Sequence, residues 1–112
     1  MNTLDQLSFH VSSTAPRGVV SSDTCLHFAQ RGSRVLGRYH GGTIHRGYLV
    51  GTVAGCVLQF RYAQVEVTGH VHGGRSLCDI EQLSDGRLRL HEHFTWETRP
   101  GSGTNCFDQI VG

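Results

Sequence analysis

The sequence predicts a single all-β domain over residues 1–112, an antiparallel up-and-down β-barrel of about eight strands. Three observations lead to this class. Apolar and polar residues alternate along most of the chain, which is the period of a strand rather than of a helix. Turn-forming residues recur about every ten residues, the spacing typical of antiparallel sandwiches and barrels. The chain also contains 15 glycines in 112 residues, and glycines within strands commonly mark bulges or sharp bends.

The expected strands follow one another with short connections. Pro16-Arg17-Gly18 and Arg31-Gly32-Ser33 predict the first two turns, and Asp85-Gly86 is the strongest hairpin signal. Arg99 to Gly103 is expected to form a loop before the last strand, with Gly101-Ser102-Gly103 as a flexible lid-like segment. The predicted strands cover residues 7–13, 24–30, 34–40, 43–53, 56–67, 69–80, 87–98 and 105–111.

Glycines inside these strands are expected where the barrel bends. Closure of eight antiparallel strands leaves an interior that holds side chains or one small ligand. It also removes the exposed strand edges that favour aggregation. The glycines expected at bulges or bends are Gly37, Gly47, Gly51, Gly69 and Gly73-Gly74.

Size and charge exclude several classes of protein. A formal charge of +1 argues against a nucleic-acid partner, and no apolar run is long enough for a membrane helix. Residues 1–9 lack the layout of a secretory signal, so we expect a cytoplasmic protein with reduced thiols. The cysteines include no CxxC pair, which gives little support to a zinc site or a redox dithiol. No cofactor is expected. The four cysteines are Cys25, Cys56, Cys78 and Cys106.

Several motifs between residues 34 and 98 resemble a known family. They are Gly37-Arg38-Tyr39, Gly41-Gly42-Thr43-Ile44, Gly47-Tyr48-Leu49-Val50-Gly51, Leu58-Gln59-Phe60-Arg61-Tyr62, Gly69, Gly73-Gly74, Asp85-Gly86-Arg87-Leu88-Arg89-Leu90-His91-Glu92 and Trp96. In this order and spacing they resemble short bacterial proteins, often labelled "N-acetylglutamate synthase", that have avidin-like or lipocalin-like barrels. An acetyltransferase usually binds the CoA pyrophosphate at a glycine-rich helix N-terminus, and the sequence predicts no such helix. The resemblance therefore implies the fold rather than the activity.

Alternation in the strand after Asp85-Gly86 places one carboxylate inside the barrel. Arg87, Arg89, His91, His93 and Thr95 should share the outer face. The residues on the opposite face are almost all apolar, so this face should point inward, and Glu92 belongs to it. A buried carboxylate must be paired, hydrogen-bonded or protonated. Glu92 is thus either a general acid or base in a pocket or a structural carboxylate tied to an arginine or tyrosine. The inward set is Leu88, Leu90, Glu92, Phe94 and Trp96.

Two further strands supply candidate lumen residues. Tyr62 and Gln64 follow Leu58 and Phe60 on one inward face, and they could reach Glu92 or bind a polar group of a ligand. In the next strand Ser76 and Cys78 are plausible lumen residues, whereas the faces of His70 and His72 depend on whether Gly73-Gly74 forms a bulge. We predict Glu92 and Tyr62 as catalytic residues. The predicted ligand-binding residues are Gln64, Ser76, Cys78, Phe60, Phe94, Trp96, Tyr48 and His72.

Histidine pairs at i and i+2 raise the question of a metal site, since a strand places such residues on one face. After His72 the residues Arg75, Ser76 and Leu77 stand where a cupin would have a glutamate. His91 and His93 share a face with arginines, which indicates solvent. We therefore predict no metal site, and the absence of Gly-x-Ser-x-Gly removes the usual signal for a serine nucleophile.

Two functions remain open at this point. In the first, the barrel binds a small hydrophobic or aromatic ligand, either as a binding protein or as a cofactor-free cyclase, isomerase or dehydratase in which Glu92 moves a proton. In the second, the lumen is filled and the barrel is a structural or interaction module that associates through outward arginines and histidines. A homo-oligomer, in the simplest case a dimer, is expected, with no nucleic-acid or membrane partner.

Overall fold

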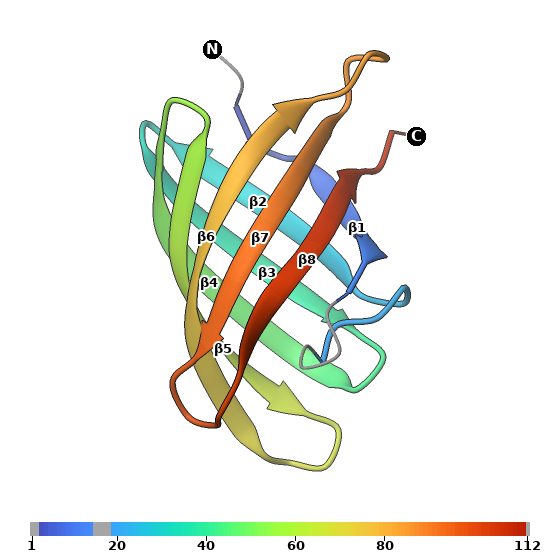
Figure 1. The fold of residues 1–112 in the computed structure, drawn as a ribbon, viewed down its shortest axis with the longest axis vertical. Helices are drawn as coiled ribbons and strands as arrows, with labels where there is room; N and C mark the ends of the chain where they lie inside the picture. Colours follow the sequence, from blue (N-terminus) through green and yellow to red (C-terminus); the bar gives the residue numbers. More distant parts are fainter. Residues whose placement is uncertain (1–2, 15–18, 112) are drawn as a thin grey trace.

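The computed structural model describes residues 3–14 and 19–111. It is a closed antiparallel barrel of eight strands in which each strand pairs with the next and β1 pairs with β8 (Figure 1). The predicted fold class is confirmed. The strands are β1 (Ser8–Ser13), β2 (Cys25–Arg31), β3 (Arg34–Gly41), β4 (Ile44–Ala54), β5 (Val57–Glu66), β6 (Val71–Gln82), β7 (Leu88–Trp96) and β8 (Ser102–Gln109).

Most turns lie where their residues predict them. Asp85-Gly86 connects β6 to β7, with Gly86 at a φ of 93° that a glycine adopts without strain. The expected loop from Arg99 to Gly103 is too long, because β8 already begins at Ser102, which pairs with Thr95. Ser102 and Gly103 are therefore part of the barrel wall and not of a lid. The predicted turn at residues 16–18 lies outside the described residues.

The glycines within strands have a different role from the one predicted. Register shifts occur between Val11 and Ser13, Tyr39 and Gly41, and Ile44 and Arg46. Pairing runs without a shift through the other strand glycines, so the pairing shows no bulge at Gly37, Gly47, Gly51 or Gly73-Gly74. Gly69 lies in the connection between β5 and β6.

Two of these glycines instead make room for tyrosine rings inside the barrel. A Cβ on Gly47 would lie 2.2 Å from the Tyr39 ring, and one on Gly74 would lie 2.6 Å from the Tyr62 hydroxyl oxygen. Contacts this short do not occur between non-bonded atoms, so any larger residue would displace the ring. Gly47 and Gly74 therefore set the space in which the two tyrosines lie.

One end of the lumen, here called the plugged end, is closed by the segment before β1. Leu4 is 1% exposed and belongs to the apolar core cluster. Its N–H donates to Gln30 Oε1 at 2.8 Å, and the Gln30 N–H donates to Asp5 Oδ1 at 2.8 Å. The β2–β3, β4–β5 and β6–β7 turns lie at this end, which is uppermost in Figure 1.

The opposite end, here called the polar end, is the one at which the β3–β4, β5–β6 and β7–β8 connections lie (Figure 1). Its inward residues include Tyr39, Gln64 and Trp96, all less than 10% exposed. The lumen therefore changes from apolar at the plugged end to mixed aromatic and polar at this end.

No helix that is long and apolar enough to cross a membrane occurs in residues 3–14 or 19–111.

Candidate functional site

A small cavity lies in the lumen between the apolar core and the polar end. Its volume is about 40 Å³, whereas a single water needs roughly 10–15 Å³ on the same measure. The wall is mainly aromatic and aliphatic, with a few polar groups. The lining residues are Val19, Val20, Thr24, Leu26, Tyr39, Leu49, Phe60, Tyr62, Gln64, Glu92, Phe94, Trp96, Asn105 and Phe107.

Glu92 is the carboxylate of this cavity, and neighbouring strands hold it in place. It lies opposite Asn105 of β8 in the strand register, and it is 6% exposed. Ser76 Oγ of β6 donates to Glu92 Oε2 at 2.6 Å, and Asn105 Nδ2 donates to Oε1 at 2.8 Å. Burial raises the pKa of Glu92, while these two hydrogen bonds oppose the shift. The carboxyl group is thus fixed in position and biased towards its protonated form.

Tyr62 lines the same cavity, and its hydroxyl lies against Gly74 of β6. Its ring packs edge-on against Phe60 and Trp96, with centroids 6.1 and 5.4 Å apart. The hydroxyl oxygen is buried and has no hydrogen-bond partner among the described residues. Burial, reinforced by the charge of Glu92, raises the pKa of Tyr62. The phenol therefore remains protonated, and it can donate a hydrogen bond.

A continuous chain of polar contacts lies at the polar end. Tyr39 donates to Gln64 Oε1 at 2.9 Å, and Gln64 Nε2 donates to Glu66 Oε2 at 3.0 Å. Arg99 pairs with the same Glu66 oxygen at 2.6 Å, and its guanidinium carbon lies 4.6 Å from the centre of a Trp96 ring. Desolvation raises the pKa of Tyr39. These contacts fix the side chains that surround the opening of the lumen.

The structure brings six of the ten predicted site residues to the cavity wall. Ser76 and Cys78 are buried as predicted, but they do not line the cavity. Ser76 donates a hydrogen bond to Glu92, and Cys78 belongs to the apolar core. Burial raises the pKa of the Cys78 thiol. The six that line the cavity are Phe60, Tyr62, Gln64, Glu92, Phe94 and Trp96.

Two predicted site residues are placed elsewhere. Tyr48 is 55% exposed on the outer surface, where Arg46 donates to its hydroxyl, because Leu49 is the inward residue of this part of β4. The prediction of Tyr48 as a lumen residue is wrong. His72 is half-buried beside the cavity but does not line it, and its Nδ1 lies 2.8 Å from Thr98 Oγ1.

The partners of the lumen carboxylate also differ from those expected. Neither Tyr62 nor Gln64 hydrogen-bonds Glu92, because Gln64 is held by Tyr39 and Glu66. Sequence reasoning missed Asn105, the residue that does. Its signal was the alternation in the last strand, in which Asn105 shares the inward face with Phe107.

The histidines expected to face solvent do so. His91 and His93 lie on the outer surface of β7, 2.8 Å from Glu81 Oε1 and 3.6 Å from Asp79 Oδ2. His70 is exposed, with Nδ1 2.9 Å from Thr68 Oγ1. Within the described ranges, no three His, Cys, Asp or Glu side chains are grouped so that they could hold a metal ion.

Comparison with known proteins agrees with this geometry. A family model described as "Avidin-like protein" matches residues 2–110. No curated protein and no solved structure gave a significant match. A closed eight-stranded barrel with a small mixed aromatic and polar cavity is the architecture expected of such a family, in which the barrel suggests binding of a small molecule. The match spans nearly the whole chain, which therefore belongs to the avidin-like protein family.

Proposed function

We propose that the lumen binds a small, mainly apolar molecule carrying one hydrogen-bond acceptor, such as a carbonyl oxygen. The observation that carries this proposal is the buried Tyr62 hydroxyl without a partner among the described residues. A buried polar group left unpaired costs about 1–3 kcal/mol of stability. A ligand oxygen that accepts the Tyr62 hydrogen bond would offset this cost.

The walls of the cavity define the rest of the ligand. Phe60, Phe94 and Trp96 supply aromatic surface, and Leu26 and Leu49 add aliphatic surface. Such a wall favours a flat or cyclic apolar group, with specificity left to a few polar contacts. At about 40 Å³, against roughly 150 Å³ for an engineered cavity that binds benzene, the cavity admits the tip of a longer molecule. A ring of the size of cyclohexanone binds only if the side chains of the wall move apart. Access is from the polar end, because Leu4 occupies the other end.

Glu92 adds an acid–base group to this binding site. In its protonated form the carboxyl carries one donor, and burial biases it towards that form. Tyr62 would polarise a carbonyl while Glu92 transfers a proton, which is sufficient for a cofactor-free cyclase, isomerase or dehydratase. Ser76 and Asn105 are positioning residues in this reaction, because both donate hydrogen bonds that hold Glu92 in place. Ser76 does so from outside the cavity lining, whereas Asn105 also lines the cavity.

Binding can be tested through Trp96, since it is the single tryptophan of the chain and lines the cavity. Cyclohexanone is expected to change Trp96 fluorescence at lower concentration than methylenecyclohexane, which has a similar shape but no acceptor oxygen. Tyr62→Phe should remove this preference, which we expect to be about two- to tenfold. The matched control is Tyr48→Phe, which deletes the same atom on the outer surface. Equal responses to the two probes in the wild-type protein would contradict the proposed acceptor site.

Catalysis is tested by the molecules that co-purify with the protein. Wild-type protein and Glu92→Gln are expressed alike, and their bound molecules are extracted for mass spectrometry. If Glu92 catalyses the reaction, the variant retains a precursor that is an isomer of the wild-type molecule or is heavier by one water. The same molecule in both proteins would make the barrel a binding protein only. A wild-type protein that binds neither the probes nor any cellular molecule would favour the filled, structural barrel.

A further inference from the structure

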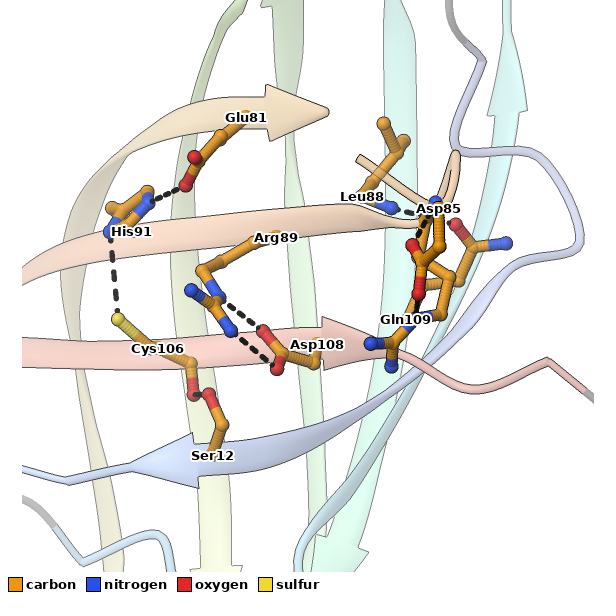
Figure 2. Close-up of polar contacts among 10 residues, drawn as sticks. Ser12, Glu81, Asp85, Leu88, Arg89, His91, Cys106, Asp108 and Gln109 are labelled. Carbon is orange, nitrogen blue, oxygen red and sulfur yellow. Dashed lines mark hydrogen bonds and ion pairs between the residues drawn. The ribbon is translucent and has the colours of Figure 1, made fainter. Parts of the chain in front are cut away.

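Three polar side chains form a chain of contacts on the outer wall of the barrel, away from the lumen. Cys106 Sγ lies 3.5 Å from His91 Nδ1, and His91 Nε2 lies 2.8 Å from Glu81 Oε1 (Figure 2). Cys106 and His91 are directly opposite each other in the β8–β7 register, and Glu81 belongs to β6. The next register pair along the same two strands is Glu92 and Asn105, which faces inward.

The contacts assign each ring nitrogen of His91 a role. Glu81 is an acceptor when ionised, so His91 Nε2 carries the hydrogen that points towards it. Nδ1 is then the free acceptor, and it faces the Cys106 thiol. A thiol, an imidazole and an orienting carboxylate in this sequence are the arrangement that activates a cysteine nucleophile. Glu81 stabilises the imidazolium that forms when His91 takes the thiol proton.

The surroundings leave this proton route intact. Arg89, the nearest cation along β7, donates to both carboxylate oxygens of Asp108 at 2.6 and 3.0 Å (Figure 2). Its charge is therefore largely compensated, and His91 is the base in contact with the thiol. Ser12 of β1 donates to the Cys106 carbonyl oxygen and leaves the thiol to His91. The other titratable groups that face this part of the wall are His10 of β1, Asp79 of β6 and His93 of β7.

The four cysteines differ in exposure, so the effect of His91 and Glu81 on Cys106 can be separated from the effect of exposure. Cys106 is half-buried and His91 is 39% exposed, so reagents can reach the pair. Cys56 is more exposed, in the β4–β5 turn, and no hydrogen bond to its thiol is found in the described part of the chain. Cys78 is buried in the core. Cys25 of β2 is exposed as well. Exposure alone would thus make Cys25 and Cys56 react faster than Cys106.

We propose that Cys106 is a nucleophilic site that forms covalent adducts with soft carbon electrophiles, specifically α,β-unsaturated carbonyl compounds. The Cys106 proton passes to His91 Nδ1 while the sulfur bonds to the β-carbon. The electron pair of the carbon–carbon double bond moves to the carbonyl group, giving an enolate. The His91 imidazolium then returns its proton to the α-carbon, so that thiol and alkene combine without any oxidant or further reactant. This site is separate from the lumen and does not depend on the function proposed for it.

The test is a short pulse of N-ethylmaleimide on the folded protein at pH 7, with each cysteine quantified by peptide mass spectrometry. A free thiol is only a few per cent thiolate at this pH, so activation can raise its rate by at most a few tens-fold. We expect Cys106 to react about tenfold faster than Cys56.

Substitutions of His91 and Glu81 show whether these side chains, rather than exposure of the thiol, determine the reaction rate of Cys106. His91→Gln should reduce the Cys106 rate to that of an ordinary thiol, and Glu81→Gln should reduce it severalfold. Neither should change the rate at Cys56, and Cys78, which is buried in the core, should stay unreactive as long as the barrel remains folded. The matched control His93→Gln removes the neighbouring outward histidine and should leave Cys106 unchanged. A wild-type Cys106 no faster than Cys56, or unaffected by His91→Gln, would overturn the proposal.

Discussion

The two ends of the lumen are built from the same eight strands but are filled in opposite ways. At the plugged end, Phe9 and Phe28 are fully buried and pack edge-to-face with ring centroids 5.5 Å apart. At the polar end, Tyr39, Gln64 and Glu66 form a chain of hydrogen bonds beside the cavity. The difference indicates a division of roles, because close apolar packing contributes stability, whereas incompletely satisfied polar groups give specificity at its expense.

The largest effect is expected at the plugged end. Phe28→Ala should lower the free energy of unfolding by about 3–5 kcal/mol, because it removes a fully buried ring and leaves a cavity against Phe9. Denaturant unfolding followed by circular dichroism measures this loss. Phe94→Ala, which enlarges the existing cavity, is the comparison at the other end and should cost less. Equal losses would mean that both ends contribute alike to stability.

This asymmetry could be predicted only in part from the sequence. The alternation from Leu88 to Trp96 gave both the strand and its buried face correctly, because a period of two requires only local information. The turn at Asp85-Gly86 was equally local. Pairing between distant strands was not, so the partners of Glu92 could not be found from the residues near it.

The incorrect predictions have similarly specific causes. Tyr48 was assigned to the lumen for its aromatic character, but in β4 the alternation places Leu49 inside. Gly47 and Gly74 were expected at bulges or bends, whereas each leaves space for a tyrosine ring from the adjacent strand. The glycine error concerns contacts between strands, which a single sequence does not contain, whereas the Tyr48 error goes against the local alternation of β4. Leu4 was not assigned a role because it precedes the first strand.

A smaller loss is expected when the plug itself is shortened. Leu4→Ala should lower the free energy of unfolding by about 2–3 kcal/mol, since the side chain is 1% exposed within the core cluster. Its backbone N–H remains free to donate to Gln30, so the segment should stay in place. Hydrogen exchange should show weaker protection at the Phe28 N–H, which donates to the Leu7 carbonyl. Unchanged stability would mean that Leu4 does not close this end.

The lumen carboxylate is expected to make stability depend on pH with a definite sign. Because burial raises the pKa of Glu92 in the folded protein, the folded state holds this proton at pH values where the unfolded state has lost it. The contribution of Glu92 to stability is full below its unfolded pKa, about 4.3, and is lost as the pH rises through the folded pKa. Glu92→Gln cannot ionise, so its stability relative to wild type should rise over this interval.

Asp108, on the outer wall of the barrel, is the control for that measurement, because its contribution to stability should change with pH in the opposite direction. Hydrogen bonds from Arg89 hold the pKa of Asp108 below its usual value, so its contribution is present above the unfolded pKa and is lost as the pH falls. Asp108→Asn should therefore lose stability relative to wild type at neutral pH and approach it in acid. Denaturant unfolding at several pH values measures both trends. A Glu92→Gln difference that does not vary with pH would show that the carboxyl has the same proton affinity in both states.

The smallest effect on stability is expected at Tyr62, and Tyr39 provides a matched comparison at the same end. Tyr39→Phe removes a hydrogen bond to Gln64 and leaves a buried acceptor, which should cost about 1–3 kcal/mol. Tyr62→Phe removes a hydroxyl that has no partner in the described part of the chain, so stability should be unchanged or slightly higher. The same single-atom deletion thus has two outcomes, depending on whether the hydroxyl serves the fold. If Tyr62→Phe cost as much as Tyr39→Phe, the Tyr62 hydroxyl would be satisfied within the folded protein, and it could not be the ligand-binding group of the lumen.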